Sequence, residues 1–356
     1  MVENLLKFGT HTPLVIQFSP SSRPLFMSSL NSINIHHSPP ATSLHPSLLL
    51  FSGGTAFNGV VEELKKLTTS VAHVLPVSDD GGSTAEIVRV LGGPAVGDIR
   101  SRCLRLSDQS TSEALAVRTL LGYRTVSWKG NILYGKMFQN PTEKPFVLFS
   151  PIFRTRSSEE QTSHFVLAMA GARIFFQSLD AAIFLFSRVS QIPTESLVLP
   201  VISTNDRLTL GCELWDGTII RGQNEISHPT SGSLQLVDKV FPTVNPSVLE
   251  QLRNVDCIIY GMGSLFTSIC PSLVLLGVGE IIAARSCAKP SEYINTVFVP
   301  KDSQIPVDIK SLAAEGIVNV VHVESMHDPK VGIVYEPKSL IEALANLLSG
   351  CTNKQS

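Results

Sequence analysis

The pattern of hydrophobic and polar positions predicts short buried strands that alternate with amphipathic helices. Compact apolar runs, typical of strands covered on both faces, occur at Ser47–Phe51, Val71–Val77, Leu197–Ile202, Asp256–Tyr260, Tyr293–Val299 and Val318–Val323. Helical spacing follows the first run, where Val60, Val61, Leu64 and Leu67 share one face. This alternation predicts an α/β fold: a doubly wound, mostly parallel, Rossmann-like sheet with helices on both faces.

Further helices are predicted from periodicity and from their boundary residues. One begins at Gly97, another near Ser107 or Asp108, and shorter ones cover Val248–Leu252 and Leu340–Leu348. The apolar stretch Phe165–Ser190 predicts one buried helix whose phenylalanines belong to the core. Asp216-Gly217, between Leu208–Trp215 and Thr218–Arg221, is a strong hairpin signal.

The two ends of the chain and one internal stretch depart from this pattern. Residues 1–47 are rich in serine and proline and contain a single acid, which predicts a disordered leader and favours a plastid transit peptide; otherwise the protein is expected in the cytoplasm. Residues 123–161 show no sustained period, which indicates either an irregular insert or a segment that was not selected for the fold. We therefore expect one α/β domain over residues 48–349, followed by a tail at 350–356.

Composition narrows the classes of partner. The formal net charge of −2 provides no basic field for nucleic acid, and no apolar run suits a membrane span. The six cysteines lack metal-site spacing and read as reduced thiols of an intracellular protein. We expect a small-molecule ligand, no nucleic acid, no membrane, and a symmetric homodimer as the default assembly.

Glycine-rich turns follow three of the predicted strands. They are Gly53-Gly54-Thr55, then Asp79-Asp80-Gly81-Gly82-Ser83-Thr84, and finally the stretch Gly261–Ser268. Glycines let a backbone approach a ligand closely, and N–H groups at a helix start favour phosphate. Because a right-handed crossover brings the ends of parallel strands to one edge, the first two turns are expected to face the same crevice.

The Asp-Asp-Gly-Gly turn has two interpretations. Asp79 and Asp80 can hold a metal ion or a substrate hydroxyl at the carboxyl end of a strand. Alternatively, the turn merely caps the helix that follows. Arg100 is suitably charged to bind phosphate in the crevice, whereas we interpret Arg102 and Arg105 as a solvated helix face.

Four motifs in this order resemble the CofD/YvcK superfamily: Gly53–Thr55, Asp79–Thr84, Gly97–Arg100 with Leu106, and Gly261–Ser268 with Pro271. The resemblance implies 2-phospho-L-lactate transferase activity, in which a phospholactyl group moves from a guanylated donor to a deazaflavin-type alcohol with Mg²⁺. The alternative is a metabolic regulator of the gluconeogenesis-factor type that binds nucleotide sugars without catalysis.

The resemblance also implies roles for individual residues. Asp79 and Asp80 would be catalytic and would bind the metal, with Asp98 and Arg100 in support. A nucleotide or nucleotide sugar would be bound by Gly53, Gly54, Thr55, Asn58, Gly81, Gly82, Ser83, Gly261, Gly263, Ser264, Thr267 and Ser268.

Three segments depart from the superfamily pattern. An Asn-Gly-Ser-x-Gly-Asn loop is expected before Gly171, where this chain has Thr162-Ser163-His164. The connection at Lys239–Val240 is short, and the strand and loop expected after Cys287 are missing. A third alternative is therefore an inactive variant isoform.

Overall fold

The computed structural model describes residues 14–18, 46–78, 88–89, 91–122, 164–214, 217–227, 242–285, 293–303, 305–329 and 332–352. The chain divides into two compact units. The first consists of Met1–Pro76, Pro193–Val201 and Lys239–Ser356, and the second of Val77–Ile192 and Ile202–Asp238.

A seven-stranded sheet forms the centre of the first unit, in the order β4-β3-β2-β7-β1-β8-β9. Its strands are β1 (Leu14–Phe18), β2 (Leu48–Phe51), β3 (Val71–Leu75), β4 (Leu197–Pro200), β7 (Cys257–Tyr260), β8 (Thr296–Pro300) and β9 (Asn319–Val323). The pairs β3–β4, β2–β3, β2–β7 and β8–β9 are parallel. The predicted parallel α/β sheet is confirmed, with each predicted strand present in a slightly shorter form.

The apolar runs form strands because both of their faces are covered. Every residue of β2 and β3 is buried, as are the first three residues of β7. Burying apolar side chains on both faces is the main favourable contribution to such a sheet. His73, in the middle of β3, is also buried and is 1% exposed.

Strand β1 lies within the segment for which a disordered leader was expected. It pairs antiparallel with β7 on one side and with β8 on the other. The expectation of disorder is therefore wrong for Leu14–Phe18, because pairing with two distant strands supplies backbone partners that no local pattern reveals. Residues 1–13 and 19–45 lie outside the described residues.

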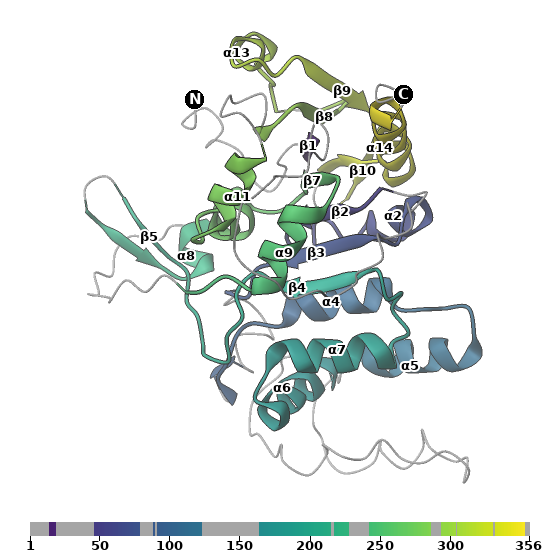
Figure 1. Cartoon of the computed structure of the whole chain (residues 1–356), viewed down its shortest axis with the longest axis vertical. Helices are drawn as coiled ribbons and strands as arrows, with labels where there is room; N and C mark the ends of the chain where they lie inside the picture. Colours follow the sequence, from purple (N-terminus) through teal and green to yellow (C-terminus); the bar gives the residue numbers. More distant parts are fainter. Residues whose placement is uncertain are drawn as a thin grey trace, which may run out of the picture. The chain divides into compact units, whose positions relative to one another are not determined.

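Helices and a hairpin complete the first unit. The helices are α2 (Val61–Leu67), α9 (Pro246–Asn254), the π-helix η1 (Leu265–Ile269), α10 (Cys270–Leu273), α11 (Val278–Ala284), α13 (Ile309–Ala314) and α14 (Pro337–Thr352). Helix α9 contacts β3, and α14 contacts both α2 and β9 (Figure 1). The hairpin of β10 (Ser325–Asp328) and β11 (Gly332–Tyr335), like α13, was not predicted from the sequence.

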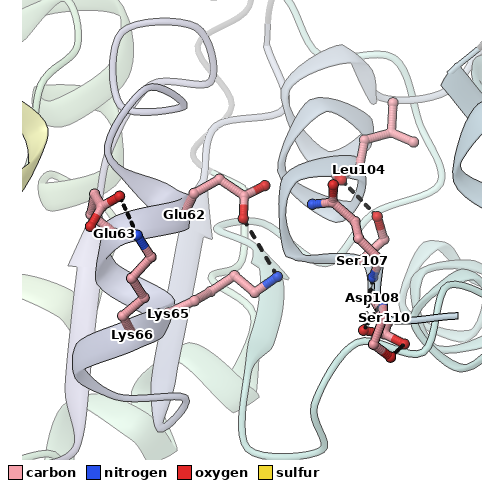
Figure 2. Close-up of polar contacts among 9 residues, drawn as sticks. Glu62, Glu63, Lys65, Lys66, Leu104, Ser107, Asp108 and Ser110 are labelled. Atoms are coloured by element: carbon pink, nitrogen blue, oxygen red, sulfur yellow. Dashed lines mark hydrogen bonds and ion pairs between the residues drawn. The ribbon is translucent and has the colours of Figure 1, made fainter. Parts of the chain in front are cut away.

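Helix α2 has the predicted amphipathic pattern. Val61 and Leu64 are buried, and ion pairs join Lys66 to Glu63 at 2.6 Å and Lys65 to Glu62 at 3.8 Å on its outer side (Figure 2). Pairs with this i,i+3 spacing stabilise exposed helices by a few tenths of a kcal/mol. The hydrophobic face therefore determines how this helix packs.

The second unit is built around four helices: α4 (Gly97–Leu106), α5 (Ser112–Gly122), α6 (His164–Phe176) and α7 (Leu179–Val189). The predicted single helix over Phe165–Ser190 is two helices, since Gln177 has a φ of 54° and the Ser178 hydroxyl accepts a hydrogen bond from Ala181 N–H. This left-handed residue and the new N-cap end one helix and begin the next.

The placement of phenylalanines in the core is only partly correct. Phe186 is 2% exposed, but Phe175 and Phe184 are each 66% exposed and Phe176 is 44% exposed. The break at Gln177 resets the helical phase, so that the apolar stripe no longer runs continuously through Phe165–Ser190.

Helix α4 corrects the interpretation of its arginines. Arg102 is fully buried rather than solvated, while Arg105 is exposed as expected. Burial lowers the pKa of Arg102 to about 10, and the nearby charge of Asp98 opposes that shift. Beyond the helix, Ser107 Oγ donates to Leu104 O at 2.7 Å (Figure 2).

The predicted hairpin around Gly217 is present. Strands β5 (Gly211–Glu213) and β6 (Ile219–Arg221) pair antiparallel, and both contact helix α8 (Gln223–Ser227). Gly217 has a φ of 84°, which a residue without Cβ adopts at no steric cost. Trp215 and Asp216 lie outside the described residues.

Among the helices in the described part of the chain, none is both long and apolar enough to cross a membrane by itself. One bent pair, Leu265–Leu273 with Val278–Ala284, passes that test by length and composition, with a bend of 71°.

Candidate functional site

The first and third glycine-rich turns lie side by side in the first unit. They leave the neighbouring parallel strands β2 and β7 at the same end, because Phe51 is paired with Tyr260. Gly261 N–H donates to Phe51 O at 2.7 Å, and Gly53 N–H donates to Met262 O at 3.2 Å. The β2–β7 pairing therefore continues into the two turns.

Glycine is required where these turns meet. A Cβ on Gly263 would lie 2.6 Å from Gly53 N, and a Cβ on Gly53 would lie 3.3 Å from Gly263 Cα. A Cβ on Gly261 would lie 2.8 Å from side-chain carbons of both Leu50 and Phe57. The absence of three side chains lets two backbone turns approach within van der Waals distance.

Hydroxyl groups gather around this contact. Ser268 Oγ lies 3.2 Å from the position of a Cβ on Gly53, and Thr267 is 1% exposed. Ser264 precedes η1 without donating or accepting a capping bond through its side chain. Short π-helical segments occur frequently at functional sites. Here η1 contains Thr267 and Ser268 and follows Ser264 directly.

Backbone donors are available on the other side of the contact. Among the described residues, no hydrogen bond is recorded for the backbone N–H groups of Gly54 and Thr55. Thr55 is exposed, and Asn58 is nearly buried with its N–H donating to Thr55 O at 3.3 Å. Such N–H groups are suitable partners for phosphate oxygens.

A helix was expected to start at the Gly53–Thr55 turn, but none does. Helix α2 begins at Val61, after a turn over residues 55–60, and it has seven residues. The N–H groups of this turn are therefore not those of a helix start. What the turn offers to a ligand is close backbone approach and individual N–H groups.

Aromatic residues adjoin both turns, and the sequence analysis did not single them out. The rings of Phe51 and Tyr260 stack with their centroids 6.0 Å apart and an interplanar angle of 8°. Burial raises the pKa of the Tyr260 hydroxyl far above its ordinary value, although the charge of Arg285 opposes this shift. Tyr260 therefore remains neutral. The sequence feature that could have revealed this pair is that each of the two strands ends in an aromatic residue just before its glycine-rich turn.

Several predicted site residues are not part of this described arrangement. Asp79, Asp80, Gly81, Gly82 and Ser83 lie outside the described residues. Asp98 and Arg100 lie on α4 in the second unit, where Arg100 is 8% exposed.

The described residues alone do not form a magnesium site. Within them, no group of three or more histidine, cysteine, aspartate or glutamate residues is placed to hold a metal ion. The nearby hydroxyls of Ser264, Thr267 and Ser268 carry no charge, and Mg²⁺ prefers carboxylates together with substrate phosphates.

A buried arginine in the second unit is another feature that the sequence analysis missed. Arg173 donates to Asn205 O at 2.9 Å and to Gly92 O at 3.2 Å, and its guanidinium occupies the space beside Gly93. Burial lowers its pKa, and Asp206 opposes the shift. Arg173 is the only charged residue of α6. A single arginine in an otherwise apolar helix is the sequence feature that could have identified it.

Residues 48–303 of the chain match the model of a protein family that is described as 2-phospho-L-lactate transferase CofD. An uncharacterized protein of Saccharomyces cerevisiae is 26% identical over 71% of this chain and 78% of its own length. The gluconeogenesis factor of Bacillus subtilis is 28% identical over 68% of this chain and 66% of its own length. That of Halalkalibacterium halodurans is 27% identical over 68% of this chain and 65% of its own length. The chain thus spans slightly less than two thirds of these two bacterial relatives.

The solved structures agree with the fold. A crystal structure of a UPF0052-family protein from Bacillus halodurans superimposes with a TM-score of 0.59 at 20% identity, covering 84% of this chain and 99% of that protein. This similarity establishes the shared α/β fold, and the family match extends over both glycine turns that meet at Gly53 and Gly263. The resemblance drawn from the motifs is confirmed: the chain belongs to the CofD family.

Proposed function

We propose that this protein binds a nucleotide or nucleotide sugar, with the phosphates lying against the Gly53–Thr55 and Gly261–Ser268 turns. The observation that carries the proposal is the backbone contact between Gly53 and Gly263, which leaves no room for a Cβ on the latter. The contact holds the Gly53–Thr55 turn beside the segment that carries the hydroxyls of Ser264, Thr267 and Ser268, with Ser268 Oγ 3.2 Å from the position of a Cβ on Gly53. Phosphate-binding loops are likewise glycine-rich.

The biological role that we favour is that of a nucleotide-sugar-binding regulator. Its support is the similarity to bacterial proteins named gluconeogenesis factors. It requires binding at the two turns and no turnover. This role does not require the protein itself to supply metal ligands.

Phospholactyl transfer is the second candidate, supported by the match to the family described as 2-phospho-L-lactate transferase. In that reaction a hydroxyl oxygen of the acceptor forms a bond to the phosphorus that carries the lactyl group. The bond from that phosphorus to the bridging oxygen of GMP breaks, and the hydroxyl proton passes to a base. Asp79 or Asp80 would accept that proton, and Mg²⁺ held by the same residues would neutralise charge on the phosphates.

The test is a thermal melt of the full chain with UDP-N-acetylglucosamine or with GDP, each with and without Mg²⁺. A ligand that binds only the folded state stabilises it by about 2.7 kcal/mol at a hundredfold excess over its dissociation constant. A shift with the uridine sugar supports the regulator. A shift with GDP, together with GMP release from a guanylated phospholactate donor, supports the transferase.

Variants connect the shift to the two turns. Thr55→Val and Ser264→Ala each remove one hydroxyl, from the first and the third turn respectively. Each variant is expected to need at least five times more ligand than the unmodified protein to give the same shift in melting temperature. Ser349→Ala is the control, because Ser349 lies in α14, outside both turns, where its Oγ donates to Ala345 O at 2.9 Å. Equal shifts in all three variants, or no shift with any ligand, would overturn the proposal. The latter result would instead favour an inactive isoform.

A further inference from the structure

We propose that Leu14–Phe18 is an internal strand donor: a segment that precedes the region matched by the family fills the slot between β7 and β8 of this chain. Strand β1 precedes the matched region, which begins at residue 48, yet it occupies an interior position of the seven-stranded sheet. The proposal concerns sheet assembly and does not depend on the ligand.

The strand on either side of the slot runs in the opposite direction to the strand that fills it. The pairs β2–β7 and β8–β9 are parallel, while β1 is antiparallel to both β7 and β8. Strands β7 and β8 therefore run in the same direction, and β1 is the reversed strand between them. Reversed strands in otherwise parallel sheets commonly lie at an edge, whereas β1 has an interior position, between the parallel groups β4-β3-β2-β7 and β8-β9.

Backbone hydrogen bonding explains why the slot must be filled. Cys257 and Gly261 N–H groups donate toward β2, to Ser47 O at 3.2 Å and to Phe51 O at 2.7 Å. Because N–H groups alternate in direction along a strand, those of Ile258 and Tyr260 point toward β1. Ile258 is fully buried, and a buried N–H without a partner costs about 1–3 kcal/mol. An extended segment beside β7 removes that cost.

The register follows from the same alternation. Val15 is paired with Tyr260 and Gln17 with Ile258, so these are the hydrogen-bonded pairs. Phe18 is paired with Cys257 and therefore belongs to the non-hydrogen-bonded class. In that class the Cα atoms are about 4.5 Å apart, within the range that a disulfide spans.

The strand donor and a cleaved leader exclude each other. A transit peptide removed near residue 47 would carry β1 away and leave the slot between β7 and β8 open. The occupant that the slot accepts is an extended apolar segment with the chemistry of Leu-Val-Ile-Gln-Phe, and this chain supplies it from its own residues 14–18.

A single cysteine tests the register in the full chain. Phe18→Cys places a thiol opposite the native Cys257, and mild oxidation is expected to link them in most molecules, as detected by peptide mapping without reductant. Gln17→Cys is the control, because Gln17 is paired with Ile258 and lies one position out of register. No link in the first variant, or equal linking in both, would overturn the proposal.

Amide exchange provides a second test that requires no new bond. Gln17→Pro removes the N–H that faces β7, whereas Gln17→Thr keeps it in a strand-forming residue. In the proline variant the amides of Ile258 and Tyr260 should exchange at least tenfold faster than in the threonine variant, while Ile259, which faces β2, changes little. A synthetic peptide of residues 12–20 should restore the protection. Identical exchange in the two variants would contradict a strand at this position.

Discussion

The backbone nitrogen of Gly53 would lie 2.6 Å from a Cβ on Gly263, although the two residues are separated by most of the chain. This contact joins the ends of β2 and β7 and forms the floor of the proposed phosphate site. A backbone atom cannot move aside as the end of a flexible side chain can. Positions 53 and 263 are therefore constrained by one another.

Gly263→Ala should destabilise the protein by about 1–3 kcal/mol, the usual cost of forcing an extra methyl group into a packed region. Gly59→Ala is the control: Gly59 is exposed, and a Cβ there meets nothing within 4 Å. The control should be neutral or stabilising by up to about 1 kcal/mol. Urea denaturation measures both values, and equal stability of the two variants would mean that the turns do not touch.

Gly93→Ala should be more destabilising than Gly92→Ala. Both glycines have positive φ, 65° at Gly92 and 85° at Gly93, so both substitutions incur a backbone cost of about 1–2 kcal/mol. Only at Gly93 would the Cβ also overlap a guanidinium, 2.4 Å from Arg173 Cζ. The difference between the two variants isolates the steric contact.

Arg173→Ala should relieve that overlap while removing the hydrogen bonds to Asn205 O and Gly92 O. The double variant Gly93→Ala/Arg173→Ala is expected to be less destabilised than the sum of the two single variants, by about 0.5–3 kcal/mol. A double-mutant cycle from denaturation curves gives this coupling. Strict additivity would show that the guanidinium lies elsewhere in solution.

Tyr335→Phe should lower the free energy of unfolding by about 1 kcal/mol. The Tyr335 hydroxyl donates to Phe298 O at 2.8 Å in a buried environment and ties β11 to β8. Removing the hydroxyl leaves that carbonyl without this donor while the ring still fills its space. A change below about 0.3 kcal/mol in chemical denaturation would indicate that water replaces the bond.

Cys103 should make the protein less stable in alkali. Burial raises the pKa of its thiol from 9.0 to about 12. The folded state therefore keeps the proton while the unfolded state loses it. This contribution to stability is fully present below pH 9 and is lost as the pH rises toward 12, at a slope of up to about 1.4 kcal/mol per pH unit.

The pH dependence can be measured against Cys103→Ala, which lacks the titrating group. The stability advantage of the unmodified protein over the variant should shrink between pH 9 and pH 10.5. Iodoacetamide should also leave Cys103 unmodified in the native protein at pH 8. Parallel pH profiles, or rapid alkylation of Cys103, would contradict a protonated buried thiol.

Hydrophobic patterns over a few neighbouring residues predicted the central strands and helix α2. The apolar runs at Leu48–Phe51 and Cys257–Tyr260 become strands because a short stretch of large apolar residues is buried only when both of its faces are covered. The spacing at Val61 and Leu64 predicts α2 for the same reason. The first and third glycine turns lie directly after strands, as predicted, and the order of motifs indicated the family that the matching model confirms.

Only the tertiary structure decided which of these elements meet. Arg102 was interpreted as solvated because its helix position says nothing of what packs over it, yet it is fully buried. The break at Gln177 exposed Phe175 and Phe184, and the pairing of Val15 with Tyr260 turned a low-complexity stretch into a strand. The sequence by itself determined the six predicted strands of the central sheet, helix α2 and the positions of the glycine turns, since periodicity and backbone freedom are properties of neighbouring residues. Burial, strand partners and the Gly53–Gly263 contact were decided by the fold, because they depend on residues hundreds of positions apart.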